Sequence, residues 1–229
     1  METVASFDIG KKNFSFYVEE FDSSKIPPPI KSEKYNIDGT PTKSMENYLS
    51  KIYKNGTKIL LLNSDLTANC DKKAYLDQET FYNMIDLLDK YKEIWDKCTI
   101  FVIEEQMSFG KQNNKMAVRL GQHCASYFYI KYGRAKKVVE FPAYHKTQVL
   151  GSQKIKKTTK TGKVSWKNID KPARKKWCIG KALEILKERD DEPTATIISK
   201  SKKKDDLSDV ICQLQAFKVI RFLDNTIIE

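Results

Sequence analysis

Residues 3–21, TVASFDIGKKNFSFYVEEF, decide the fold, because they predict an antiparallel hairpin at the start of the chain. Aromatic and β-branched residues alternate with other residues in the runs 3–10 and 13–21, as they do in two paired strands. The four residues Gly10 to Asn13 supply a short turn between the runs. A hairpin start excludes a purely parallel sheet. We therefore expect an α/β protein with a mixed sheet and helices on both faces.

The rest of the chain alternates predicted strands with predicted helices. Residues 99–106, TIFVIEEQ, form a continuous apolar run that ends in acid, which is typical of a central strand. Three consecutive prolines place a loop at about residues 23–33, and a second loop is expected at about 190–200. The pattern predicts further strands at 58–64 and 136–143, and helices at 77–95, 115–133, 144–151, 170–191 and from about 205 onward.

Size and charge limit the classes of function. A chain of 229 residues with 40% hydrophobic content suits one large domain or two small ones and excludes wholesale disorder. The 41 basic and 30 acidic residues give a net charge of +11, which favours a polyanionic partner such as nucleic acid or an acidic membrane surface. Most of this excess lies in a basic insert at about residues 151–176, which holds ten Lys or Arg and one Asp, a net charge of +9.

The cysteines and the hydropathy pattern indicate an intracellular protein. The five cysteines are scattered, odd in number and without a Cys-x-x-Cys pair, so we expect reduced thiols that lie mostly in the core. With only two histidines and no paired ligands, a zinc site is not expected. No secretory signal is visible at the amino terminus, and no apolar run approaches the ~20 residues that cross a bilayer.

Acidic side chains stand at the ends of two predicted strands. Asp8 sits on the otherwise apolar first strand, so it is either hydrogen-bonded at the strand end or holds a cation. Glu104 and Glu105 end the strand at 99–106. Consecutive strand residues point to opposite faces, so at most one of these two shares a face with Asp8. Periodicity leaves open which one does.

Another acidic group, Asp205, Asp206 and Asp209, opens the last helix. Asp206 and Asp209 are one turn apart, and Asp206 falls at the margin of the predicted apolar stripe, while Asp205 lies further toward solvent. Two interpretations are open. Acids in a first turn stabilise a helix through its dipole, and acids brought together from distant segments can bind metal.

Convergence of the strand and helix acids favours the metal interpretation. Four carboxylates without His or Cys suit Mg²⁺, with Mn²⁺ as a substitute. Two such ions ~3.5–4 Å apart can clamp the attacking and leaving oxygens of a phosphodiester. The lysines around the acids then hold a phosphate backbone that the carboxylates alone would repel.

The motifs SFDIGKKN (6–13), FVIEEQ (101–106) and KKKDDLSDVICQLQ (202–215) together resemble the RuvC-type Holliday junction resolvases of the RNase H-like superfamily. The resemblance is to the branch from poxviruses and other large DNA viruses and to the mitochondrial resolvases of yeasts. Two departures stand out: Glu105 doubles the acid, and the basic insert is long. Matched by motif, the catalytic and metal-binding residues implied are Asp8, Glu104, Asp206 and Asp209.

The resemblance implies a single RNase H-like nuclease domain over residues 1–229, with a mixed, mostly five-stranded sheet. It implies a homodimer that resolves four-way DNA junctions by paired symmetric nicks, with two Mg²⁺ ions in each active site and 5′-phosphate products. The helix at 115–133 is assigned to the dimer interface on the same basis. Lys146 follows the last strand, where such enzymes often carry a lysine near the scissile phosphate; a surface lysine is the alternative.

The basic insert predicts contacts to the DNA backbone, with a solvated loop as the alternative. Trp166 either stacks on an unpaired base or anchors the following helix. The residues assigned to DNA binding are Lys154, Lys156, Lys157, Lys160, Lys163, Trp166 and Lys167.

Two other functions fit the same residues. One is an RNase H-type enzyme that cuts RNA in an RNA–DNA hybrid, and the other is a non-catalytic, basic nucleic-acid-binding protein whose acids only cap helices. If the chain is viral, we expect it in the host cytoplasm, at the viral factory; otherwise a mitochondrial or nuclear location is expected.

Overall fold

The computed structural model of the chain describes residues 1–71, 75–106, 114–158 and 162–224. The chain folds into two compact units, each built from two segments. The first, called the sheet unit, comprises Met1–Phe21 and Thr57–Ala143, and the second, called the helical unit, comprises Asp22–Gly56 and Tyr144–Glu229. One domain over residues 1–229 stays a prediction.

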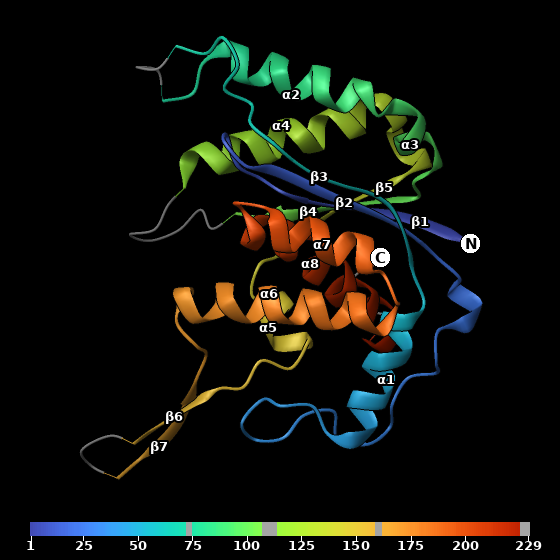
Figure 1. Cartoon of the computed structure of the whole chain (residues 1–229), viewed down its shortest axis with the longest axis vertical. Helices are drawn as coiled ribbons and strands as arrows, with labels where there is room; N and C mark the ends of the chain where they lie inside the picture. The colour runs from blue at the N-terminus through green and yellow to red at the C-terminus, as the bar shows by residue number, and fades with distance from the viewer. Residues whose placement is uncertain (72–74, 107–113, 159–161, 225–229) are drawn as a thin grey trace. The chain divides into compact units, whose positions relative to one another are not determined.

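The sheet unit is built on a mixed five-stranded sheet in the order β3-β2-β1-β4-β5 (Figure 1). Strand β2 pairs antiparallel with β1 and β3, whereas β4 runs parallel to both β1 and β5. This confirms the mixed sheet and its hairpin start. The strands are β1 (Glu2–Asp8), β2 (Phe14–Phe21), β3 (Thr57–Ser64), β4 (Ile100–Glu105) and β5 (Lys137–Pro142).

The turn between β1 and β2 depends on a glycine. A Cβ at Gly10 would lie 2.8 Å from the backbone oxygen of Asn13, closer than any side chain tolerates. The turn fixes the register of the hairpin, which pairs Asp8 with Ser15. Phe7, Phe14 and Phe16 then share one face and enter the core.

Helices α2 (Gln78–Lys90) and α4 (Lys115–Tyr132) cover that face of the sheet (Figure 1). The predicted helix at 77–95 is in fact two, because the backbone breaks at Tyr91 before α3 (Lys92–Lys97). The break lets the fully buried Trp95 donate its indole N–H to the Leu88 carbonyl oxygen at 2.6 Å.

The helical unit contains five α-helices and a two-stranded hairpin among its described residues. The helices are α1 (Lys43–Lys54), α5 (His145–Val149), α6 (Lys171–Glu188), α7 (Glu192–Lys200) and α8 (Lys204–Asp224). The hairpin pairs β6 (Ile155–Thr158) with β7 (Val164–Lys167) and extends away from α5 and α6 (Figure 1). A short 3₁₀ turn, Ser23–Lys25, begins the predicted loop at 23–33.

For this unit, one sequence prediction was wrong and one helix was missed. The expected loop at 190–200 is helix α7, because Asp191 caps its first turn by accepting from the Thr194 N–H, and Pro193 lies in that turn, where proline is tolerated. Helix α1 was missed, although Thr42 caps it and apolar residues follow at spacings of three and four.

The final helix is buried around almost its whole circumference. The predicted apolar stripe is buried, but so are Gln213, Gln215 and Lys218 on its other sides. Lys218 donates from its Nζ to the carbonyl oxygens of Ile52 (3.3 Å) and Asn55 (2.7 Å), at the end of α1. A single-face projection therefore underestimated how much of α8 is enclosed.

All five cysteines are free thiols, and all but the half-buried Cys70 are buried, as predicted. Burial raises the pKa of the Cys98 thiol to about 12. In the described part of the chain, no helix has the length and hydropathy needed to span a membrane.

Candidate functional site

Two carboxylates lie side by side at the carboxyl ends of adjacent parallel strands. The register of β1 and β4 pairs Phe7 with Ile103, so Asp8 and Glu104 follow as neighbours. Phe7 and Ile103 point into the core under α2 and α4, so Asp8 and Glu104 point to the opposite face. Both acids are half-buried.

The structure shows that Glu104, and not Glu105, shares a face of the sheet with Asp8. Glu105 is exposed, and it alternates with Glu104, so it shares the face of Ile103. It lines a small cavity of about 120 Å³ together with Glu104, Gln122 and Glu140. Gln122 and Glu140 hydrogen-bond to each other at 2.7 Å. Glu104, the residue matched by motif, is the one beside Asp8.

A polar row crosses the sheet at the level of Asp8. Ser15 pairs with Asp8 across β1 and β2, and Asn63 pairs with Ser15 across β2 and β3. The Asn63 amide donates from Nδ2 to the Ser15 Oγ at 2.6 Å. Sequence reasoning missed Ser15 and Asn63; the hairpin register could have revealed Ser15, since the turn at 10–13 sets 15 opposite 8.

In the helical unit, Asp206 occupies a place that disfavours its charge. Its Oδ2 atom is buried and has no hydrogen-bond partner among the described residues. Burial, and then the negative charge of Asp205, raise the pKa of Asp206 above its usual value. A buried carboxylate oxygen without a donor is the arrangement that a cation would satisfy.

Asp205 differs because it has a partner. Burial works against its ionisation, but the hydrogen bond and charge of Lys175 on α6 outweigh this and hold the pKa of Asp205 below its usual value. The same hydrogen bond raises the pKa of Lys175, with smaller contributions from Asp206 and Asp209. Sequence reasoning missed Lys175, which only the packing of α6 on α8 identifies.

Lys146 and Asp209 form an ion pair between α5 and α8. Lys146 Nζ lies 3.5 Å from Asp209 Oδ2, and the two side chains are 6% and 22% exposed. The alternative of a surface lysine is therefore wrong. Helix α5 begins directly after β5, so this lysine sits where the chain enters the helical unit.

The four candidate ligands fall as one pair in each unit, Asp8 with Glu104 and Asp206 with Asp209. In the described part of either unit, no three His, Cys, Asp or Glu side chains are grouped closely enough to hold a metal ion. The donors present are carboxylate oxygens, and one of them, Asp206 Oδ2, lacks a partner among the described residues. This donor set fits Mg²⁺ or Mn²⁺ and does not fit a metal that prefers nitrogen or sulfur ligands.

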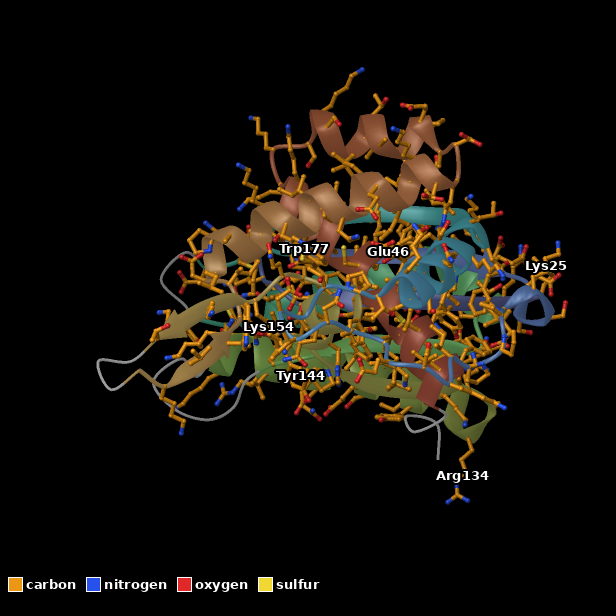
Figure 2. All side chains as sticks on the ribbon, turned by 90° about the horizontal axis from the view of Figure 1, so that it is seen from below. Lys25, Glu46, Arg134, Tyr144, Lys154 and Trp177 are labelled. Atoms are coloured by element: carbon orange, nitrogen blue, oxygen red, sulfur yellow. The ribbon has the colours of Figure 1, made fainter. Side chains whose placement is uncertain are left out.

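The basic insert is a hairpin followed by the start of α6, rather than a loop without structure. Trp166 is half-buried and lines a cavity instead of anchoring the core. Lys154 lies where the hairpin joins the rest of its unit (Figure 2), and Lys160 lies outside the described residues. Four lysines of the hairpin region are exposed: Lys156, Lys157, Lys163 and Lys167.

The sequence has two relatives in iridescent viruses. Uncharacterized protein 170L of Invertebrate iridescent virus 6 is 37% identical over 227 residues, which cover 94% of this chain and 88% of the relative. The chain belongs to the family of this viral protein. Uncharacterized protein 97L of Invertebrate iridescent virus 3 is 28% identical over 94% of this chain and 98% of its own length. No protein-family model matches the chain.

The fold of the chain is similar to that of a solved Holliday junction resolvase. The fowlpox virus resolvase, solved in complex with Holliday junction DNA, aligns with a TM-score of 0.52 and 15% identity over 95% of this chain and 98% of its own. The chain thus shares the fold of this resolvase, as the sequence motifs implied.

Proposed function

We propose that the chain is a structure-selective endonuclease that resolves four-way DNA junctions by paired symmetric nicks and leaves 5′-phosphate ends. The observation that carries the proposal is the adjacency of Asp8 and Glu104 on one face, at the ends of neighbouring parallel strands. A fold shared along the whole chain with a resolvase solved on junction DNA supports the choice of substrate.

In this proposal, Asp8 and Glu104 from the sheet act together with Asp206 and Asp209 from α8 as ligands of two Mg²⁺ ions, which Mn²⁺ can replace. Bound Mg²⁺ lowers the pKa of water and stabilises negative charge on phosphate oxygens. The carboxylates orient this chemistry, and their mutual repulsion makes their joint ionisation depend on bound cations. The Asp206 oxygen that lacks a partner among the described residues supports this proposed role as a ligand.

Lys146 is proposed to act beside the scissile phosphate. Its ammonium group is held in a buried position by Asp209 at 3.5 Å, so its charge is fixed in place rather than carried on a flexible surface chain. A fixed positive charge stabilises the charge that develops on a phosphoryl oxygen.

The exposed lysines of the hairpin are proposed to bind the DNA backbone, together with Lys154 and Lys160. Exposed lysines neutralise phosphates and release counterions, which gives affinity without reading the base sequence. A homodimer would match the near two-fold symmetry of a four-way junction with two equivalent active sites. Because protein 170L comes from a virus, we also propose that the enzyme acts in the host cytoplasm during viral DNA processing. Imaging of the tagged protein in infected cells would test this location.

The test is cleavage of a synthetic four-way junction by the purified protein, with and without Mg²⁺. Asp8→Asn, Glu104→Gln and Asp206→Asn should each lower the cleavage rate at least 100-fold, by order of magnitude for a lost essential group, and leave junction binding intact. Glu105→Gln is the matched control, since the same change one residue later falls on the opposite face. Unchanged cleavage in all three site variants would overturn the assignment.

The substrate is tested by comparing the junction with a linear duplex and an RNA–DNA hybrid of the same sequence. Preference for the hybrid would establish an RNase H-type enzyme. Binding to all three without metal-dependent cleavage would establish a non-catalytic DNA-binding protein.

A further inference from the structure

A cavity of about 650 Å³ opens in the helical unit beside the hairpin. Its aromatic wall is Trp166 of β7, and its apolar floor includes Val219 and Ile220 of α8. The volume falls in the range of roughly 300–1,000 Å³ that small-ligand pockets occupy.

All charged residues in the described lining of the cavity are basic. Lys34, Lys154 and Lys167 line it from three separate segments of the chain. The described lining residues include no Asp or Glu, and they add the amides of Asn36 and Gln148. A ligand that suits this lining has an anionic group for the lysines and a flat, partly apolar group for Trp166 and the floor.

Hydrogen bonds within the unit hold the lining segments of the cavity together. The Tyr35 hydroxyl donates to the Val149 carbonyl oxygen at 2.7 Å, and the Lys154 N–H donates to the Asp38 carbonyl oxygen at 2.6 Å. Gly39 has a φ of +83°, and a Cβ there would press on the Lys154 side chain at 3.2 Å. Glycine therefore lets the loop approach Lys154 closely, so the cavity is formed before any ligand arrives.

We propose that this cavity receives one unstacked nucleotide of a DNA strand, with its base against Trp166 and its phosphates against the three lysines. The inference rests on the proposed function only in taking DNA as the ligand. Aromatic stacking of this kind is tolerant of base identity, because every base has a π-face. The site would therefore recognise a branched or single-stranded region by its unpaired base rather than by its sequence.

The test compares two probes of equal length and charge: a single-stranded oligonucleotide of eight thymidines and the same backbone carrying abasic sites. Binding is measured by fluorescence anisotropy in EDTA, so no cleavage occurs. The wild type should prefer the thymidine probe by about 10-fold, as expected for one stacked base. Trp166→Ala should abolish the preference, and Trp166→Phe, which keeps an aromatic face, should retain most of it.

Trp177→Ala is the matched control, because Trp177 is a half-buried tryptophan of the same unit that is absent from the lining of this cavity. It should keep the preference. The double variant Lys34→Ala/Lys154→Ala should weaken binding of both probes alike. Equal affinity of the wild type for the two probes would overturn the proposal, as would loss of the preference in Trp177→Ala, or binding of a polyglutamate peptide as tight as that of the thymidine probe.

Parallel assays of junction cleavage separate this inference from the proposed function. Metal-dependent cleavage without a base preference would overturn the nucleotide pocket alone. A base preference without cleavage would support the pocket and overturn the nuclease assignment.

Discussion

At the scale of single residues, Asp206 is a carboxyl group whose ionised form is disfavoured by its surroundings in the folded protein. Its buried oxygen has no donor among the described residues, and its pKa is raised, whereas Asp205, the residue before it, is paired with Lys175. An acid whose pKa is raised by folding costs stability at neutral pH, and this cost disappears as the pH falls through the raised value. Such a cost is common at functional positions.

Asp206→Asn is therefore expected to stabilise the metal-free protein. Removing the buried negative charge should raise the Tm in EDTA by roughly 2–4 °C. This shift corresponds to about 1 kcal/mol in the free energy of unfolding for a chain of this size. The measurement is thermal unfolding at neutral pH, and the gain should shrink in acid. Mg²⁺ should stabilise the wild type more than the variant.

Asp205→Asn is the control, and its effect on the melting temperature should have the opposite sign. Its lowered pKa means that the ionised form contributes stability above its usual pKa, and that this is lost as the pH falls through the lowered value. The variant should therefore melt at or below the wild-type temperature. A lower Tm for Asp206→Asn would show that its carboxylate is satisfied without metal.

At the scale of elements, α5 and α8 are linked by the ion pair of Lys146 and Asp209. Removing either partner takes a counterion away from a charge that is half-buried or buried, and such single changes cost more than removing both. A double-mutant cycle of Lys146→Met and Asp209→Asn in EDTA should give a coupling free energy of roughly 0.5–3 kcal/mol by urea unfolding. Strictly additive effects would mean that the pair does not form in solution.

The exposed lysines of the hairpin lead to a prediction about the salt dependence of DNA binding. Replacing Lys156, Lys157, Lys163 and Lys167 by Ala should reduce the slope of log K against log salt for junction binding by about 3–4, at about 0.9 per lost phosphate contact. The melting temperature should stay unchanged, since these side chains are outside the core. Exposed Lys51 on α1 offers a control substitution away from the hairpin.

Strands were easier to predict from the sequence than the helical unit. The central strand β4 and the first hairpin follow from alternation and from one glycine turn, which are local properties. Helix α7 was mistaken for a loop, although Asp191 caps it and Pro193 lies in its first turn, where proline is tolerated. The pairing of Asp8 with Glu104 followed from motifs, but the face they share required the sheet register.

At the scale of the whole molecule, the proposed dimer depends on an exposed helix face. On α4, Tyr129 is 52% exposed and Ile130 is 86% exposed, so two consecutive large apolar side chains lie on the surface of this helix. Ile130→Arg should shift the sedimenting species from a dimer to a monomer of 26.5 kDa and slow paired nicking of the junction. Ile37→Arg is the control, because Ile37 is 80% exposed and lies outside α4. A wild type that already sediments as a monomer would refute the homodimer.

The order in which the chain supplies its parts has a consequence for synthesis on the ribosome. The five strands are complete by Pro142, so the sheet and its two acids can form while translation continues. Asp206 and Asp209 emerge much later, with α8, and the helical unit also needs the early segment that carries α1. A nascent chain paused before α8 thus holds two of the four proposed ligands, so the proposed nuclease activity would begin only after elongation passes α8.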